Sequence, residues 1–557
     1  MLTQVHPAES HPLYEKTGAQ INRLQSLGIP AKEAWISLQE RKPALNGFAA
    51  DRWVCELYEV VKPLFRQVDY QDFDVVDMAV LFADRFSGQV SNCDEGLASW
   101  HLLELRAREL LDYLGLPFPN GASLRTQLAR LENPIWWRRQ LSLVTPRIVD
   151  QTTRKLGQVS REDEIYLSDA AFAMYQRRCR SSRLLLDDYQ AVNDWGQVYT
   201  LAELADLSIS NPVHRRVEMM VRCRGLDERA QELGWQATFV TLTAPSKYHR
   251  FTGDGECNEA WNGTSPRDVH EYLAKLWARV RSRFSDHDID YYGVRVVEPH
   301  HDGCPHWHLL IYSCDIEAVE TITRRYAMAE DSWEAGARQH RCKFERIDPS
   351  LGSGVGDIAK YVSKSIDGYQ VAEDRHGRPA EDSAKRVTAW CRIWGIRQFQ
   401  FFGTGAIGVY RELRRVRNRQ LTEPYAEIWQ SADTGCYRGV MEAMDHGDFR
   451  LHREPWSDEE TGECDSPFNG YGELKPLPIR GVVCDRKTGG SFPPLYTRLS
   501  QWSIERIPRE EVQCDGETGA PWTCVNNCTP TTPGYHSTTL NSLTTDPPTR
   551  LSQYQRH

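Results

Sequence analysis

The sequence of 557 residues contains no CxxC pair, no apolar run long enough to span a membrane and no GxxxxGK[ST] phosphate-binding loop. Without such a run, no transmembrane helix is expected. The first 18 residues lack a basic segment followed by an apolar one, so we predict no secretory signal and a cytoplasmic protein. The 15 cysteines are odd in number and irregularly spaced, which favours reduced thiols over a disulfide framework. A zinc site at Cys524 and Cys528 is an alternative, but the spacing favours free thiols.

Excess positive charge is also absent. The chain has 67 Lys and Arg against 77 Asp and Glu, a formal net charge of −10, which taken whole argues against a simple basic nucleic-acid binder. The charge is segregated, however. Residues 1–420 hold 55 bases and 57 acids, whereas residues 421–557 hold 12 bases and 20 acids. The acidic balance therefore does not exclude DNA, and any DNA contact is expected in the first part.

The length suggests two to four domains, and predicted strands that alternate with helices indicate an α/β or α+β domain with helical regions around it. We divide the chain, in order, into a mostly helical N-terminal region at 1–124, a basic helical region at 125–234, a domain of strands and helices at 235–420, an acidic and partly disordered linker at 421–470, a small module at 471–528 and a flexible tail at 529–557. Residues 125–183 hold 12 bases and 6 acids, which suits a nucleic-acid backbone about as well as a solvated helix surface.

Within 213–366 the hydrophobic patterns alternate between the two periods of helices and strands. They predict strands over 235–243, 291–298, 306–313 and 339–347, and helices over 213–233, 267–284, 316–331 and 357–366.

The most informative segment, residues 298–312 (EPHHDGCPHWHLLIY), has two histidines spaced as alternate strand residues. His306 and His308 share one face, because residues two apart in a strand point the same way. The prolines and Asp-Gly before them predict a turn, which would place Glu298 opposite His306 on the neighbouring strand. Two imidazoles and a carboxylate suit a divalent ion: the imidazoles favour Mn²⁺ or Zn²⁺, and with a phosphate and waters Mg²⁺ is also usable. His300 and His301, in the turn, are alternative ligands.

A second segment, residues 356–367 (GDIAKYVSKSID), reads as a helix. Its apolar residues recur every four positions, and Tyr361 and Lys364 lie side by side on another face. A tyrosine hydroxyl is a weak nucleophile at neutral pH, but a neighbouring ammonium and a metal-bound phosphate would favour its reaction. Alone, this spacing is as typical of a core tyrosine beside a solvated lysine.

Together, the HxH strand and the Tyr-Lys helix some 50 residues later resemble the HUH endonuclease superfamily. Residues 239–243 (FVTLT) resemble its first motif strand. Residues 386–400 and 409–415 look like the replication gene A proteins of tailed bacteriophages.

The resemblance implies an HUH-type antiparallel sheet with flanking helices and a metal-dependent endonuclease that initiates rolling-circle replication. It implies that Tyr361 attacks a phosphodiester at the phage origin and stays joined to the 5′ phosphate, while a 3′ hydroxyl is freed and the strand is later rejoined. It further implies that His306, His308 and Glu298 hold Mg²⁺ or Mn²⁺, and that Lys364 assists.

One residue departs from the family pattern. Several members have two tyrosines one helical turn apart, and Asp357 stands where the first would be. We therefore expect Tyr361 alone to cleave, with a second monomer or another nucleophile closing the strand. Without a phosphate-binding loop, strand separation is expected to need a host helicase, alongside the host replication machinery.

Single-stranded or locally melted DNA would have to be held near the tyrosine by aromatic and basic side chains. The candidates are Trp390, Trp394, Arg397, Phe399, Arg411, Arg414, Arg415, Arg417 and Arg419. The arginines from 411 onward fall on a predicted helix over 409–420, where so dense a cluster favours phosphate contact.

Two other functions fit the same residues. One is a transposase or conjugative relaxase with the same chemistry, which the likeness near residues 390–415 disfavours. The other is a non-catalytic DNA-binding replication regulator with a vestigial site, which the complete set of His306, His308, Tyr361 and Lys364 disfavours.

Overall fold

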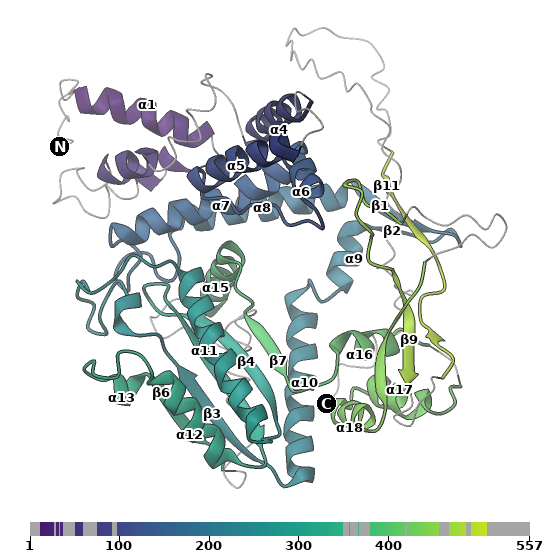
Figure 1. Ribbon diagram of the computed structural model, residues 1–557. Helices are drawn as coiled ribbons and strands as arrows, with labels where there is room; N and C mark the ends of the chain where they lie inside the picture. The colour runs from purple at the N-terminus through teal and green to yellow at the C-terminus, as the bar shows by residue number, and fades with distance from the viewer. Residues whose placement is uncertain are drawn as a thin grey trace, which may run out of the picture.

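A computed structural model of the chain (Figure 1) describes its helical, central and C-terminal regions with gaps. The described residues are 12–26, 29–32, 34–36, 51–59, 75–91, 97–348, 356, 362, 366, 379–417, 420–455, 467–485 and 492–508. Within them, no helix combines the length and the apolar character needed to cross a membrane.

The N-terminal region is helical, as predicted, and its helices pack on one another. Its elements are α1 (Pro12–Ser26), α4 (Val75–Ser91), α5 (Leu97–Tyr113), α6 (Leu124–Leu131), α7 (Pro134–Lys155) and α8 (Asp169–Asp187). The Phe82 ring of α4 stacks on the Trp137 ring of α7, with their centroids 4.7 Å apart. The Trp53 indole N–H donates to the Thr153 hydroxyl over 2.9 Å. These contacts join the first hundred residues to the basic helical region in one core.

The central sheet has five antiparallel strands in the order β6-β3-β5-β4-β7. Its strands are β3 (Gln236–Leu242), β4 (Tyr291–Pro299), β5 (Pro305–Ser313), β6 (Cys342–Arg346) and β7 (Phe399–Phe402). The first four confirm the strands predicted at 235–243, 291–298, 306–313 and 339–347. This antiparallel sheet with flanking helices confirms the α+β class.

Helices cover both faces of this sheet (Figure 1). They are α10 (Pro212–Leu233), α11 (Pro266–Asp286), α12 (Ile316–Ala327), α15 (Ala380–Trp394) and α16 (Ile407–Leu413). Helices α11 and α12 pack on the face that carries Trp307, Leu309 and Ile311, in a core continuous with the N-terminal helices. Helices α10 and α16 pack on the other face, against Leu310 and Tyr312. Helix α10 ends at Gly234, whose φ of 68° is the left-handed conformation that glycine adopts easily.

The acidic segment 421–470 differs from the linker expected from its charge. Its first part folds into α17 (Tyr425–Asp433), α18 (Tyr437–His446) and strand β8 (Asp448–Arg453). Ile428, Tyr437 and Val440 are buried in the core that backs the central sheet. The acids of α17 and α18 lie on the outer faces of these amphipathic helices, so residues 421–455 belong to the folded body.

The C-terminal strands also differ from the independent module expected at 471–528. They are β9 (Ile479–Asp485), β10 (Leu495–Tyr496) and β11 (Trp502–Arg506). Strands β8, β9 and β10 form one small sheet, whereas β11 pairs with β1 (Tyr189–Asn193), which also pairs with β2 (Val198–Thr200). A short helix, α9 (Leu201–Leu207), follows β2. The chain therefore returns from its C-terminal part to pair with a strand near its first third.

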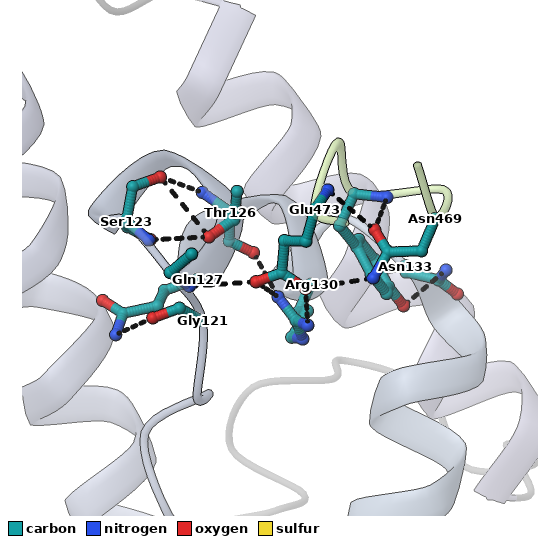
Figure 2. A network of polar contacts seen from close by, with 10 residues as sticks. Gly121, Ser123, Thr126, Gln127, Arg130, Asn133, Asn469 and Glu473 are labelled. Atoms are coloured by element: carbon teal, nitrogen blue, oxygen red, sulfur yellow. Dashed lines mark hydrogen bonds and ion pairs between the residues drawn. The ribbon is translucent and has the colours of Figure 1, made fainter. Parts of the chain in front are cut away.

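A polar network fastens the turn at residues 467–475 to the N-terminal helices (Figure 2). Glu473 accepts two hydrogen bonds from the Arg130 guanidinium, at 2.5 and 3.2 Å, and one from the Ala122 backbone N–H at 3.0 Å. The Arg130 guanidinium lies over the Tyr471 ring, 4.4 Å from its centroid, and Asn133 donates to the Tyr471 hydroxyl. These hydrogen bonds, chiefly those from Arg130, lower the pKa of Glu473 to about 2.

Candidate metal centre

The two strands β4 and β5 bring together three side chains of the types that can ligate a metal ion. Their register pairs Glu298 with His306 and Val296 with His308. Side-chain alternation then puts Glu298, His306 and His308 on one face, which we call the metal face. One ligand atom from each of the three lies within 4.8 Å of the others. Glu298 and His308 are both only 6% exposed, so a bound ion would meet little competing water on that side.

Neighbours on strand β3 orient His308. The Thr241 hydroxyl lies 3.1 Å from His308 Nδ1, and the Phe239 ring stacks on the imidazole at 5.5 Å between centroids. With Nδ1 engaged, Nε2 faces Glu298 Oε2 at 3.8 Å. A hydrogen bond to one ring nitrogen fixes the tautomer and presents the other nitrogen to a metal.

The hairpin that joins β4 to β5 is held by a buried carboxylate at its tip. Asp302 is fully buried and accepts from the backbone N–H groups of Cys304 and Arg250, each over 2.9 Å. Burial alone would raise the pKa of Asp302, but the positive charges of His249 and Arg154 lower it below its usual range. Gly303 has a φ of +74°, and a Cβ there would clash with Arg154. The turn therefore needs glycine at this position.

The turn histidines stand beside the group of three rather than in it. The His300 ring lies 4.1 Å from the His306 ring between centroids. Burial, with the charge of His249, lowers the pKa of His300 to about 3, and burial also lowers that of His301. Among the residues that the structure describes, the geometric group contains Glu298 and neither turn histidine.

The predicted nucleophile Tyr361, its partner Lys364 and Asp357 lie outside the described residues. Their neighbours Val362 and Ile366 are helical and buried, in a cluster with Met219 of α10. Phe399 and Phe401 of β7 pack against that cluster.

The register locates this cluster on the sheet. Phe399 pairs with Val296, which pairs in turn with His308. Because residues paired across strands share a face, Phe399 belongs to the metal face. Val362 and Ile366 thus pack on the same side of the sheet as the three ligating residues.

Two of the predicted DNA-stacking residues lie in the core. Trp390 is fully buried and Trp394 is 3% exposed. Their indole N–H groups donate to the Gly303 carbonyl and to the Asp150 carboxylate, at 3.1 and 3.0 Å. Neither ring has a face open to a base, so both side chains anchor α15 against the hairpin and α7. Phe399 packs under the Val362 cluster.

The arginines predicted to contact DNA have different surroundings. Arg411 forms a bidentate ion pair with Glu218, with distances of 2.9 and 2.6 Å. Arg415 lies 3.4 Å from Glu412, whereas Arg414, Arg417 and Arg397 are exposed. The predicted helix over 409–420 is shorter than expected, since α16 ends at Leu413, and Arg419 lies outside the described residues. Of the exposed arginines, Arg414 lies over the Tyr410 ring, 5.6 Å from its centroid.

Sequence reasoning missed two residues of the metal face. Thr241 pairs with His308 on one side and with Lys343 of β6 on the other. Lys343 is exposed and is therefore a cation on the metal face, two strands from His308. Only the pairing register reveals these neighbours, because β3 and β6 are far from the HxH motif in the sequence.

Comparison with protein families matches residues 119–369 to the model described as bacteriophage replication gene A protein (GPA). The matched range contains Glu298, His306, His308, Tyr361 and Lys364. No solved structure matches the chain.

Three relatives illustrate the similarity. The replication gene A protein of Escherichia phage 186 is 38% identical over 72% of this chain and 59% of its own length. The probable replication protein P12 of Pseudoalteromonas phage PM2 is 34% identical over 73% and 62%, respectively. A probable replication endonuclease from a prophage-like region of Salmonella typhimurium is 32% identical over 72% and 51%. The chain thus spans between half and two thirds of the length of these relatives.

Proposed function

We propose that this chain, which over residues 119–369 matches the bacteriophage replication gene A protein family, initiates phage DNA replication by nicking one strand at the origin. The observation that carries the proposal is the convergence of Glu298, His306 and His308 on the metal face. The name of the Salmonella relative, a probable replication endonuclease, agrees with cleavage of DNA.

The donor set fits a divalent ion. One carboxylate and two imidazoles leave coordination positions open for phosphate oxygens and water, as Mn²⁺ or Mg²⁺ requires. When bound, such an ion would polarise the scissile phosphate and align it for in-line attack. Thr241, through His308 Nδ1, and the His300 ring, against His306, keep the imidazoles oriented for this task.

The proposed nucleophile is Tyr361, whose neighbour Val362 packs on the metal face. Its phenolic oxygen would bond to phosphorus while the bond from phosphorus to the 3′ oxygen breaks. The phenol loses its proton and the leaving 3′ oxygen gains one, so the products are a 5′-phosphotyrosyl link and a 3′ hydroxyl that primes synthesis. Lys364 would stabilise the charge that develops during transfer. The reverse reaction would rejoin the strand.

The partners follow from this chemistry. The substrate is single-stranded or locally melted origin DNA in the host cytoplasm, and strand separation is assigned to a host helicase working with the host replication machinery. With Asp357 in place of a first tyrosine, rejoining would need a second monomer or another nucleophile.

The test is formation of a covalent adduct. The protein is incubated with single-stranded fragments tiled across the genome that carries this gene, with Mg²⁺ or Mn²⁺. We expect a protease-sensitive DNA adduct, its loss in Tyr361→Phe and its retention in the control Tyr326→Phe, which alters a tyrosine of α12. An adduct that persists in Tyr361→Phe would show that another residue attacks, and no adduct with any fragment would favour the non-catalytic regulator. Strand-transfer activity on transposon ends would favour the transposase or relaxase.

A further inference from the structure

Four arginines gather near the end of α15 and the start of β7, and most of them lack an acidic partner among the described residues. We define the arginine cluster as Arg147 of α7, Arg267 of α11, Arg295 of β4 and Arg397, which lies just before β7. Among the described residues, the one recorded ion pair of these four joins Arg267 to Glu271, at 3.1 Å with both side chains about half exposed. Arg147 and Arg295 donate to backbone carbonyls.

The end of helix α15 brings two of the guanidinium groups together. A Cβ placed on Gly395 would lie 2.9 Å from Arg267 Nη1 and 3.2 Å from Arg147 Nη2. The two like charges are therefore at most about 6 Å apart, a separation at which they repel. Gly395 leaves room for both, and Arg147 Nε donates to the Ile393 carbonyl over 2.6 Å.

Arg295 extends the cluster inward. It is 5% exposed, and its guanidinium lies over the Trp307 ring, 4.0 Å from the centroid. It donates to the Arg397 carbonyl over 3.2 Å, while its Nε has no hydrogen-bond partner among the described residues. Burial, then the charges of Arg397 and Arg281, lower its pKa to about 10. A buried guanidinium without a carboxylate is costly, and such sites are candidates for binding an anion.

Arg397 links the cluster to the metal centre. The Val297 N–H donates to the Gln398 carbonyl over 2.8 Å, which carries the β4–β7 pairing one step beyond Phe399. The same register sets Arg397 beside Glu298, about 5 Å away at the spacing of neighbouring strands. Arg397 is exposed and marks the border between the metal face and the arginine cluster.

We propose that the arginine cluster binds phosphates of the DNA strand that continues from the scissile site around the β7 edge. The occupant is a phosphodiester backbone because the cluster offers an exposed guanidinium at Arg397, a half-exposed one at Arg267 and a buried one at Arg295, with a single flanking acid. This inference rests on the proposed function, since it assumes that the DNA strand is bound and cleaved at the metal centre.

The experiment measures the affinity of the full chain for a single-stranded oligodeoxythymidine of about 30 nucleotides, long enough for several phosphate contacts. We expect Arg267→Gln and Arg397→Gln each to weaken binding about fivefold, and to lower the slope of log Kd against log salt by about 0.7. The matched control is Arg283→Gln, which removes an exposed arginine, paired with Asp286 at 3.3 Å, from the other end of α11. It should bind like the unaltered chain.

An oligonucleotide with uncharged methylphosphonate linkages separates phosphate contact from other effects. The unaltered chain and the two variants should bind it equally weakly. Thermal unfolding of Arg267→Gln should not shift to lower temperature, because the substitution removes one of two repelling charges. Equal affinity and salt slope in all variants, or the same loss with the uncharged oligonucleotide, would overturn the proposal.

Failure of this inference is distinguishable from failure of the proposed function. His306→Ala should abolish the covalent adduct while leaving the oligonucleotide affinity and its salt slope unchanged. If the unaltered protein forms the adduct but the arginine variants bind the oligonucleotide with unchanged affinity, only the proposal about the arginine cluster is wrong. If the arginine variants bind the oligonucleotide more weakly but no adduct forms under any condition, the result supports DNA binding by the arginine cluster and contradicts the nicking reaction.

Discussion

The two faces of the central sheet carry opposite chemistry on the same strands. On β4, Glu298 points to the metal face, whereas Arg295 points to the face covered by α11. On β5, His306 and His308 lie on the metal face, and Trp307 supports Arg295 on the other. Because side chains alternate, a one-residue slip in register would exchange the two sets. The pairing of the strands is thus what separates metal-ligating groups from guanidinium groups.

The largest effect is expected from a substitution on the metal face, on the rate of adduct formation. His308→Ala removes a ligand and should lower the rate of adduct formation about a thousandfold, a loss of several kcal/mol of transition-state stabilisation. The measurement is the initial rate of adduct formation at saturating Mn²⁺. The control, His287→Ala, alters an exposed histidine after α11. A rate within a few-fold of the unaltered protein would contradict the assignment of His308.

The next largest effect is expected from a substitution on the opposite face of the sheet, on the stability of the fold. Trp307 is fully buried and donates to His270 Nδ1 over 3.3 Å. Trp307→Ala should lower the free energy of unfolding by about 3–5 kcal/mol, because a large cavity replaces the ring. Urea denaturation measures the change. Trp333→Ala removes a ring that is 83% exposed and should leave stability nearly unchanged.

A smaller effect, on metal affinity, is expected from a substitution beside His308 on the metal face. Thr241→Val keeps the side-chain shape but removes the hydroxyl beside His308. We expect Mn²⁺ affinity to fall about tenfold, since partners of ligating histidines typically contribute that much. Titration calorimetry tests this, with Thr243→Val as the control because the Thr243 hydroxyl donates to the His340 carbonyl instead. Unchanged Mn²⁺ affinity in Thr241→Val would remove Thr241 from the site.

A pH effect is expected from the opposite face. Burial, then the charges of Arg295 and Arg267, lower the pKa of His270 to about 4 from its ordinary 6.5. The unfolded chain binds this proton first as pH falls, so His270 makes stability decrease between pH 6.5 and about 4 and adds no dependence above 6.5. His270→Gln should flatten urea unfolding free energies over that window. An unchanged pH profile would contradict the lowered pKa.

The smallest effect is expected on DNA affinity, from two substitutions on opposite faces of the edge strand β6. Lys343 lies on the metal face of β6 and pairs with Glu345 at 2.8 Å, whereas Arg346 lies on the other face and pairs with Glu320 at 3.1 Å. Lys343→Gln should weaken binding of single-stranded DNA about threefold, and Arg346→Gln should leave it unchanged. Fluorescence anisotropy measures both. A greater loss of DNA affinity in Arg346→Gln than in Lys343→Gln would contradict DNA contact with the metal face at the β6 edge.

Local patterns predicted much of the central domain. The strands β3 to β6 and helix α10 follow from period-two and helical spacing, and the Asp-Gly turn predicted the pairing of Glu298 with His306. The prediction from composition was wrong where we gave the net charge more weight than the helical spacing of the apolar residues. The acids of 421–455 suggested a linker, yet Ile428 and Val440 mark buried helix faces. Trp390 and Trp394 could not be assigned from sequence, because an aromatic stripe suits a core as well as a DNA surface.

The sequence by itself determined the convergence of Glu298, His306 and His308, since these residues lie within one hairpin whose turn and alternation are local properties. It also determined the likeness to the replication gene A proteins, through motifs read along the chain. Only the tertiary structure decided the arginine cluster. Its members come from α7, α11, β4 and the segment before β7, up to 250 positions apart. Their proximity depends on helix packing around the sheet, which no local pattern records.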